Sequence, residues 1–297
     1  MKLIQNLKIP HLIIIILAFS FNGFGQNSNK FAGIIKVQDS LLITYRLEFE
    51  ESNGLISGFS LTDFGGEHET KSRVSGTYDD NKRLIEFKEV ELIYTKSPVD
   101  QQDFCNIHLK PTKFKLGSTK LFGDFLGKFS DGTECINGEI AMNSVEKIQK
   151  RVNKFTKKVK KSNRIPDSVK QIVNNIKILD TLNLNVLKKN QTTSVLTASS
   201  IVKVIIYDGG QMDNDIISIK KNGKFILSKY TISKDRKVIE LPINTDIVKL
   251  EVISESVGTI GSNTAIIEIL DGKNKIKTMT NLNKGEVTKI DIIKRKF

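Results

Sequence analysis

Three aspartates lie close together in the last third of the chain. Asp208, Asp213 and Asp215 fall within eight residues of one another, in a segment that also contains Gly209 and Gly210. Carboxylate and backbone carbonyl oxygens are the hard ligands that Ca²⁺ prefers. Aspartates in turns also bond to their own backbone, and this spacing is not that of an EF-hand loop. The sequence therefore leaves two interpretations, a calcium site and a metal-free turn, and it predicts no other cofactor.

Two cysteines, Cys105 and Cys135, predict one disulfide bond. In an exported chain an isolated pair is most simply structural. Closing a loop of about 30 residues contributes about 3–4 kcal/mol when the unfolded state is treated as a flexible chain. The alternatives are a redox dithiol and a metal site. No C-x-x-C spacing supports the first, and no further ligands near the pair support the second.

The chain offers few residues for catalysis. His68 lies in an acidic loop, and His108 lies at an outward position of an expected strand. No Ser/His/Asp or Cys/His arrangement can be assembled from the sequence. Glu48 and Glu50 share one strand face, where solvated carboxylates are the ordinary outcome. An enzyme of the carboxylate-dependent hydrolase class is therefore only the second alternative to a binding function.

Positive charge is concentrated in one short stretch. The formal net charge is +13 at pH 7, and residues 146–164 hold nine Lys/Arg against Glu146 alone. A strongly basic chain is a candidate for binding nucleic acid or an anionic surface. Trp is absent, and no zinc, RRM or KH pattern occurs. We therefore expect no nucleic-acid partner.

The basic stretch has the period of a helix. Apolar residues recur three and four positions apart along residues 145–159, and Asn143 and Glu146 are placed to cap the start. A second helix is expected to open at Pro166, because proline is favoured at the first helical position. Residues 143–181 are thus predicted to form a basic two-helix connector.

Basic side chains fill the rest of the first helix. Such a surface can lie on an anionic membrane or dock an envelope protein. The alternative is that the apolar stripe packs on a β domain while the lysines face solvent. The residues of the predicted partner or membrane surface are Lys150, Arg151, Lys154, Phe155, Lys157 and Lys158.

The N-terminus has the pattern of a secretory signal peptide. Lys2 and Lys8 precede an apolar run at residues 12–21, and small residues stand before a cleavage point at Gln26. The run is about half of the ~20 residues that a transmembrane helix needs. We therefore expect removal of residues 1–25, no membrane span afterwards, and a mature protein in the periplasm or at the surface of a Gram-negative-type bacterium.

Residues 26–142 alternate with period two, as strands with one buried face do. Turn signals such as Asn53-Gly54 and Asp131-Gly132 separate the runs. About eight short strands in a meander predict a small antiparallel barrel or sandwich. The runs are residues 41–49, 55–62, 73–78, 83–94, 105–110, 113–116, 121–129 and 135–142.

Glycines occur inside the expected strands, as in the segment Phe122-Gly-Asp-Phe-Leu-Gly-Lys-Phe. Interior glycines mark bulges or tight bends at barrel corners. Residues 122–140 resemble the closing hairpin of a lipocalin- or avidin-like barrel. The first alternative function is accordingly a lipocalin-like carrier of an apolar small molecule. The phenylalanines that would line its cavity, or equally fill a core, are Phe59, Phe64, Phe87, Phe122, Phe125 and Phe129.

The last third of the chain, residues 182–297, returns to strands and predicts an all-β sandwich. Asn222-Gly223 is a strong hairpin signal, because both turn positions tolerate positive φ. The other motifs are residues 206–219, 256–265 and 271–272. Together these motifs resemble a β-sandwich module of secreted bacterial envelope proteins. That resemblance implies the fold and export, and it implies no activity.

The sequence as a whole predicts a mainly β protein with four parts. These are a signal peptide at 1–25, a small antiparallel barrel or sandwich at 26–142, the connector at 143–181 and a C-terminal β-sandwich at 182–297. The chain offers β surfaces and loops without a catalytic constellation. We therefore predict an exported, non-enzymatic binding or interaction protein of the bacterial cell envelope.

Overall fold

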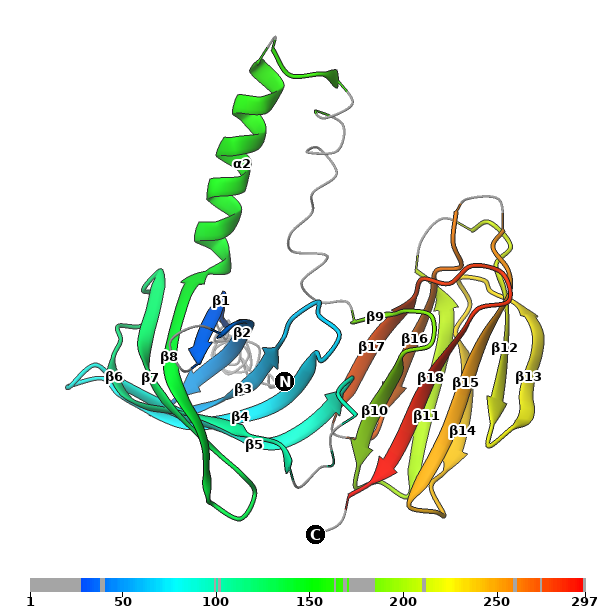
Figure 1. The fold of residues 1–297 in the computed structure, drawn as a ribbon, viewed down its shortest axis with the longest axis horizontal. Coiled ribbons are helices and arrows are strands. Elements are labelled where there is room, and N and C mark those ends of the chain that lie inside the picture. The colour runs from blue at the N-terminus through cyan, green and yellow to red at the C-terminus, as the bar shows by residue number, and fades with distance from the viewer. Residues whose placement is uncertain are drawn as a thin grey trace, which may run out of the picture.

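The structure is a computed structural model that describes residues 28–37, 41–98, 100, 103–162, 164–167, 170, 185–209, 212–258, 261–272 and 274–295. The described chain is mainly β with one long helix, as Figure 1 shows, so the predicted fold class is confirmed at that level. The predicted signal peptide lies outside the described residues. Within the described ranges, no helix is long and apolar enough to span a membrane.

Eight strands in the N-terminal half close into an antiparallel barrel. Each strand pairs with the next along the chain, and the last pairs with the first. Closure leaves no unpaired sheet edge within the barrel. Of the two predicted alternatives, an antiparallel barrel and a sandwich, the structure is the barrel. The strands are β1 (Asn29–Val37), β2 (Leu41–Ser52), β3 (Leu55–Thr62), β4 (Thr70–Asp79), β5 (Leu84–Thr95), β6 (Asn106–Lys113), β7 (Lys120–Lys128) and β8 (Glu134–Ser144).

The predicted strand runs and the observed strands differ at two places. β1 had no run of its own, because the outward Ile34 and the inward Gly33 blur its alternation. Residues 113–116 were expected to be a strand, but β6 ends at Lys113 and the next residues form a turn. Phe114 in this turn is buried, and its backbone N–H donates to the Arg83 carbonyl at 2.8 Å. The buried Phe114 covers the end of the barrel from a turn, and in the sequence it has the same apolar spacing as an inward residue of a strand.

Alternation sorts the barrel side chains into an inner and an outer set. On β2, Tyr45, Leu47 and Phe49 point inward and are buried. One end of the interior is filled by rings with centroids 5.8–6.4 Å apart. An eight-stranded barrel is just wide enough for its interior to be filled in this way. The ring cluster consists of Phe31, Phe49, Tyr78 and Phe114.

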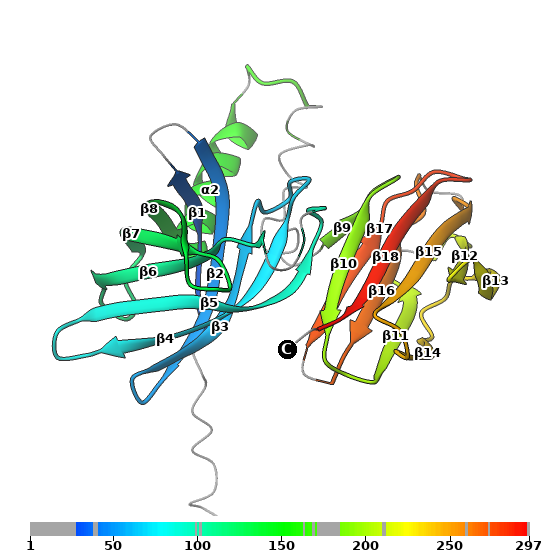
Figure 2. The same cartoon turned by 60° about the horizontal axis from the view of Figure 1, so that its bottom comes forward.

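Strand β5 belongs to the barrel and to the second half of the chain. From Leu84 to Lys88 it pairs with β6 and closes the barrel, whereas Tyr94 and Thr95 pair with β10 (Thr192–Thr197). Two register shifts in the pairing with β4 lie between these halves. Such bulges bend a strand and increase its twist. Figure 2 shows β5 leaving the barrel to run beside β10.

The remaining strands form two layers. β13, β12, β15, β18 and β10 continue the sheet that contains β5, and β14, β11, β16, β17 and β9 form a second sheet. β10 pairs with β18, and β9 with β17, in parallel. Their bounds are β9 (Asn185–Leu187), β11 (Ile201–Asp208), β12 (Ile216–Lys221), β13 (Lys224–Thr231), β14 (Lys237–Pro242), β15 (Ile247–Ser256), β16 (Ala265–Leu270), β17 (Lys275–Thr280) and β18 (Val287–Lys294).

One apolar core spans both layers and reaches the barrel. Inward residues of both sheets, such as Val204 and Ile292, belong to one buried cluster. Ile93 and Tyr94 of β5 belong to the same cluster, and Phe59 and Leu61 on the outside of β3 pack against it. Burial of apolar surface stabilises by about 25 cal/mol per Å². The outer face of the barrel is thus part of the second core.

Helix α2 (Val145–Lys161) follows β8 without a loop. Its N-cap is Ser144, whose hydroxyl accepts from the Lys147 N–H at 3.3 Å, so the predicted capping by Asn143 is wrong. A serine hydroxyl reaches the third residue of a helix from the cap position. Most of the expected second helix, from Pro166 onward, lies outside the described residues. The two-helix form of the connector therefore stays a prediction.

Arg295, near the end of the chain, joins the barrel strand β5 to β10 of the continuing sheet. Its guanidinium donates to the carbonyl of Leu92 at 2.6 Å and to that of Leu196 at 3.3 Å. It also pairs with Glu91 at 2.9 Å. These contacts bind β10 to β5 directly beside their short pairing, so we infer that Arg295 stabilises the junction.

We expect Arg295→Met to lower the free energy of unfolding by about 1–3 kcal/mol, because it leaves two carbonyls and Glu91 short of a donor. Urea denaturation measures the change. Lys294→Met is the control, since the side chain of Lys294 is exposed. Equal stability of the two variants would contradict a junction role for Arg295.

Candidate functional site

The end of the barrel opposite the ring cluster opens into a pocket, which we call the mouth. It has a volume of about 460 Å³ and lies where β2, β4 and β6 begin and β3 and β5 end. This volume is in the range of small-molecule sites, which are apolar with a few polar groups. Apolar lining residues are Leu41, Leu42, Ile43 and Phe104, and polar ones include His68, Thr70, Ser72, Glu89 and Asn106.

A buried carboxylate lies at the floor of the mouth. Glu89 Oε1 accepts from the hydroxyls of Ser60 at 2.6 Å and Tyr45 at 3.1 Å. Oε2 accepts from the backbone N–H of Ile107 at 2.9 Å. Burial raises the pKa of the Glu89 carboxyl above its ordinary value, and these three hydrogen bonds oppose that rise. The floor of the mouth is therefore a polar network inside an otherwise apolar barrel.

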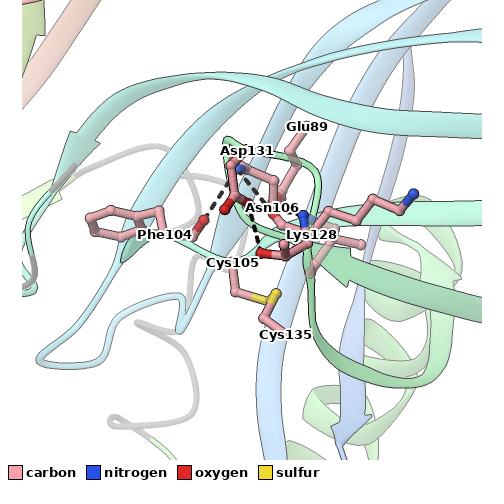
Figure 3. The surroundings of a disulfide bond; sticks show 9 residues. Glu89, Phe104, Cys105, Asn106, Lys128, Asp131 and Cys135 are labelled. Carbon is pink, nitrogen blue, oxygen red and sulfur yellow. Dashed lines mark hydrogen bonds between the residues drawn. A yellow bond between two sulfur atoms is a disulfide. The ribbon is translucent and has the colours of Figure 1, made fainter. Parts of the chain in front are cut away.

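The predicted disulfide is confirmed and stands at the rim of the mouth. Cys105 and Cys135 are joined, with a Cα–Cα distance of 6.0 Å. Figure 3 shows its surroundings, which include Glu89 and Asn106. The bond passes over Gly127, where a Cβ would overlap the Cys105 sulfur. The glycine in this strand therefore makes room for the disulfide.

Hydrogen bonds hold the chain on both sides of the disulfide. The Asn106 side-chain amide donates to the carbonyls of Phe104 at 3.2 Å and Lys128 at 3.3 Å. In the next turn Asp131 accepts from the Thr133 N–H at 2.9 Å. Figure 3 shows this set at one edge of the barrel. The disulfide and these bonds keep the β6, β7 and β8 side of the mouth in place.

Two of the six phenylalanines proposed to line a barrel cavity lie in the barrel core. Phe87 and Phe125 are buried there, where they fill the interior. Phe122 is 59% exposed, and Phe59 packs on the second core outside the barrel. Phe64 and Phe129 are half-buried in loops. The predicted cavity lining is therefore wrong for most of the set, because strand parity turns Phe59 and Phe122 outward.

The three aspartates of the predicted calcium site lie around the end of β11. Asp213 and Asp215 are buried, and Asp215 Oδ2 accepts from the Thr264 N–H at 2.9 Å. Burial, with the nearby charges of Asp213 and Asp208, raises the pKa of Asp215. In the described ranges, which omit residues 210 and 211, no group of three His, Cys, Asp or Glu side chains is placed to hold a metal. Calcium binding there stays a prediction.

The predicted partner surface lies on α2, which projects from the barrel in Figure 1. Val145 and Val159 on the apolar stripe are buried, whereas Phe155 is 58% exposed. α2 contacts β1 and β8 at the barrel end where it begins. The remaining residues of the predicted surface are exposed; they are Lys150, Arg151, Lys154, Lys157 and Lys158.

The mouth network was missed from the sequence, although one signal was present. Glu89 follows Ile85 and Phe87 at the same inward parity of one strand. A glutamate at an inward position is buried and needs partners. Tyr45 and Ser60 occupy inward positions of β2 and β3 by the same rule. Periodicity shows that each points inward, but only the register of the closed barrel brings them together.

Comparisons with known proteins show no family. No family model matches the chain, and no curated protein matches it. Among solved structures it is similar to SGBP-B of the Bacteroides ovatus mixed-linkage glucan utilization locus, solved with a mixed-linkage heptasaccharide. The identity is 9% and the TM-score 0.17, over 90% of this chain and 60% of that protein. This chain spans less than two thirds of that protein's length, and so low a TM-score establishes no shared fold.

Glu89 makes stability depend on pH. Because the pKa of the Glu89 carboxyl is raised in the folded protein, folding favours its protonated form. The stability that Glu89 contributes is therefore fully present below the ordinary pKa of glutamate, and it is lost as the pH rises through the raised pKa. Glu89→Gln removes this loss, and the hydroxyls of Tyr45 and Ser60 can rotate to accept from the new amide. We expect the variant to gain about 1 kcal/mol relative to wild type between about pH 5 and about pH 8.

Urea denaturation at the two pH values measures this difference. Glu86→Gln is the matched control, because Glu86 is exposed on the same strand. A Glu89→Gln variant that loses stability relative to wild type at the higher pH would show that Glu89 is favoured as a charged group.

Proposed function

We propose that this protein is an exported, non-enzymatic binding protein of the cell envelope that takes a small amphipathic molecule in the mouth. The observation that carries the proposal is the pocket of about 460 Å³ at one end of a closed eight-stranded barrel. Barrels of this size hold one small ligand at most. The ring cluster fills the far end, which leaves the mouth as the place for a ligand.

The lining of the mouth supports an amphipathic ligand. Leu41 and Leu42 are 57% and 59% exposed beside the opening. Exposed apolar side chains that gather around a concave site are typical of ligand-binding surfaces. His68, Thr70 and Asn106 add polar groups to the same wall. An apolar body with a hydrogen-bonding group fits this mixture.

The disulfide supports export. Bonds such as Cys105–Cys135 persist in oxidising compartments and are rare in the cytosol. The signal-peptide pattern at residues 1–25 predicts the same destination. We therefore propose the periplasm or the cell surface as the place where the mouth meets its ligand.

The proposal predicts a releasable small molecule. Native mass spectrometry of the mature protein, purified from its own host's envelope, should show a mass that is lost on denaturation. Ser72→Leu adds bulk at a buried position of the mouth and should lower the loaded fraction at least about tenfold, which is about 1.4 kcal/mol of binding. Ser75→Leu is the control on the outer face of the same strand.

Two results would contradict the carrier function. One is a wild-type protein that carries no ligand in any preparation. The other is equal loading of the Ser72→Leu and Ser75→Leu variants, which would place the ligand elsewhere.

The basic face of α2 supports a second proposal, that the protein lies on an anionic lipid surface. Eight Lys/Arg and one Glu occur along its 17 residues. At 100° per residue most of the basic residues lie on the face opposite the apolar stripe, and the exposed Phe155 lies at one boundary of that stripe. Each Lys or Arg near an anionic bilayer contributes about 1 kcal/mol.

Vesicle co-sedimentation tests this second proposal. The mature protein should bind phosphatidylglycerol-containing vesicles and not pure phosphatidylcholine vesicles, and salt should weaken the binding. Replacing Lys150, Lys154 and Lys157 with Glu should lower affinity by at least about 100-fold. The matched control replaces Lys224, Lys234 and Lys237, which are exposed on the two-sheet part of the chain from β9 to β18, the second unit. If both triple variants lost vesicle affinity equally, binding would depend on the net charge of the protein and not on α2.

A further inference from the structure

The outer face of the barrel carries two rows of side chains across its strands. The register aligns Arg46 of β2 with Leu61 of β3 and Lys71 of β4. The neighbouring row contains Glu48, Phe59 and Arg73 in the same order of strands. Strand pairing thus places three cations, Arg46, Lys71 and Arg73, within two adjacent rows.

A cavity separates these rows from the second sheet. Its volume is about 120 Å³, and its barrel wall includes Arg46, Phe59, Lys71 and Tyr94. The opposite wall consists of Asn185 at the start of β9 and residues 275–277 of β17. β9 pairs with β17 only from Thr278 onward, so residues 275–277 lie beyond that pairing. The cavity therefore lies at the junction of the two units.

The carboxylates that line the cavity are paired with other cations. Glu48 contacts Lys30 at 2.8 Å and Arg46 at 3.4 Å. Glu69 contacts the buried Lys96 at 3.4 Å, and it also accepts from the Tyr94 hydroxyl at 3.0 Å. Both carboxylates therefore have direct partners other than Lys71.

The third cation of the rows, Arg73, also has its own partners. It donates to Glu91 and to Asn274, each at 2.5 Å. Glu91 therefore compensates its charge.

Lys71 lacks such a partner. Within the described part of the chain its ammonium forms no ion pair, and it lies 4.6 Å from the centre of the Phe59 ring. Burial lowers the pKa of Lys71; the charges of Glu48 and Glu69 oppose this shift, whereas those of Arg46 and Arg73 add to it. The pKa of Lys71 stays lowered, so the two carboxylates do not fully offset burial and the two guanidinium charges, and a further anion beside the ammonium would be favourable.

Asn185, on the opposite wall of the cavity, also lacks polar partners. It is 4% exposed, and neither its amide nitrogen nor its amide oxygen has a hydrogen-bond partner in the described residues. A buried amide without partners costs about 1–3 kcal/mol. Such an amide in the wall of a cavity that also contains an ammonium can donate to a ligand bound there.

We propose that the junction cavity binds a small oxyanion, a carboxylate, sulfate or phosphate group, with Lys71 and Asn185 as donors from opposite walls. The cavity volume of about 120 Å³ fits one such group and excludes a large ligand. An ammonium and an amide N–H both donate to oxyanions, and the charge-assisted bond is the stronger. Because the two walls belong to different units, bound anion stabilises the junction.

Calorimetry and thermal denaturation of the mature protein test the proposal. Sulfate, phosphate and acetate, at ionic strength held constant with NaCl, should raise the Tm by about 2–4 °C near saturation. Lys71→Met should abolish this rise and, in dilute buffer, should itself raise the Tm, because it removes a charge whose burial Glu48 and Glu69 offset only in part. Asn185→Leu should weaken anion binding while leaving Lys71 in place. Lys88→Met, an exposed lysine of β5, is the matched control.

The probes also distinguish the source of the group. Binding of sulfate or phosphate alone indicates a free inorganic ion. Binding of glucuronate, but not of glucose, indicates a carboxylate carried by a larger molecule. The proposal is overturned if none of these anions binds wild type, or if Lys71→Met responds to them as Lys88→Met does.

Discussion

The whole architecture depends on one strand having two neighbours on the same side. The first half of β5 closes the barrel on β6, and its end pairs with β10 to begin the second unit. The bulges in its pairing with β4 make this change of partner feasible, because they bend the strand between the two halves. The two units consequently share a sheet, and through Ile93 and Tyr94 they share a core.

Closure of the barrel decides where a ligand can bind. The ring cluster fills one end, while Glu89, Tyr45 and Ser60 form a polar floor below the other. The disulfide and the Asn106 hydrogen bonds hold one side of the opening. A rigid rim above a polar floor is the arrangement expected of a preorganised binding site.

Positive charge acts differently in the two places where it gathers. On α2 the lysines are solvated, and their effect is long-range attraction that salt screens. At the junction, Arg46 and Lys71 line the cavity beside the second sheet and are largely withdrawn from water, so each needs a close partner. A count of charges along the chain finds the first group and overlooks the second, because the junction cations come from separate strands.

The amino-acid sequence alone determined the period-two strands and the span of α2, because both depend on residues that are neighbours in the chain. It also determined the Cys105–Cys135 pairing, because the chain has only two cysteines. The tertiary structure alone decided that β1 meets β8, that Glu89 meets Tyr45, and that Arg295 reaches Leu92. Alternation tells which face a residue occupies, but not which core that face covers. That choice depends on register between segments far apart in the chain, and no local pattern encodes it.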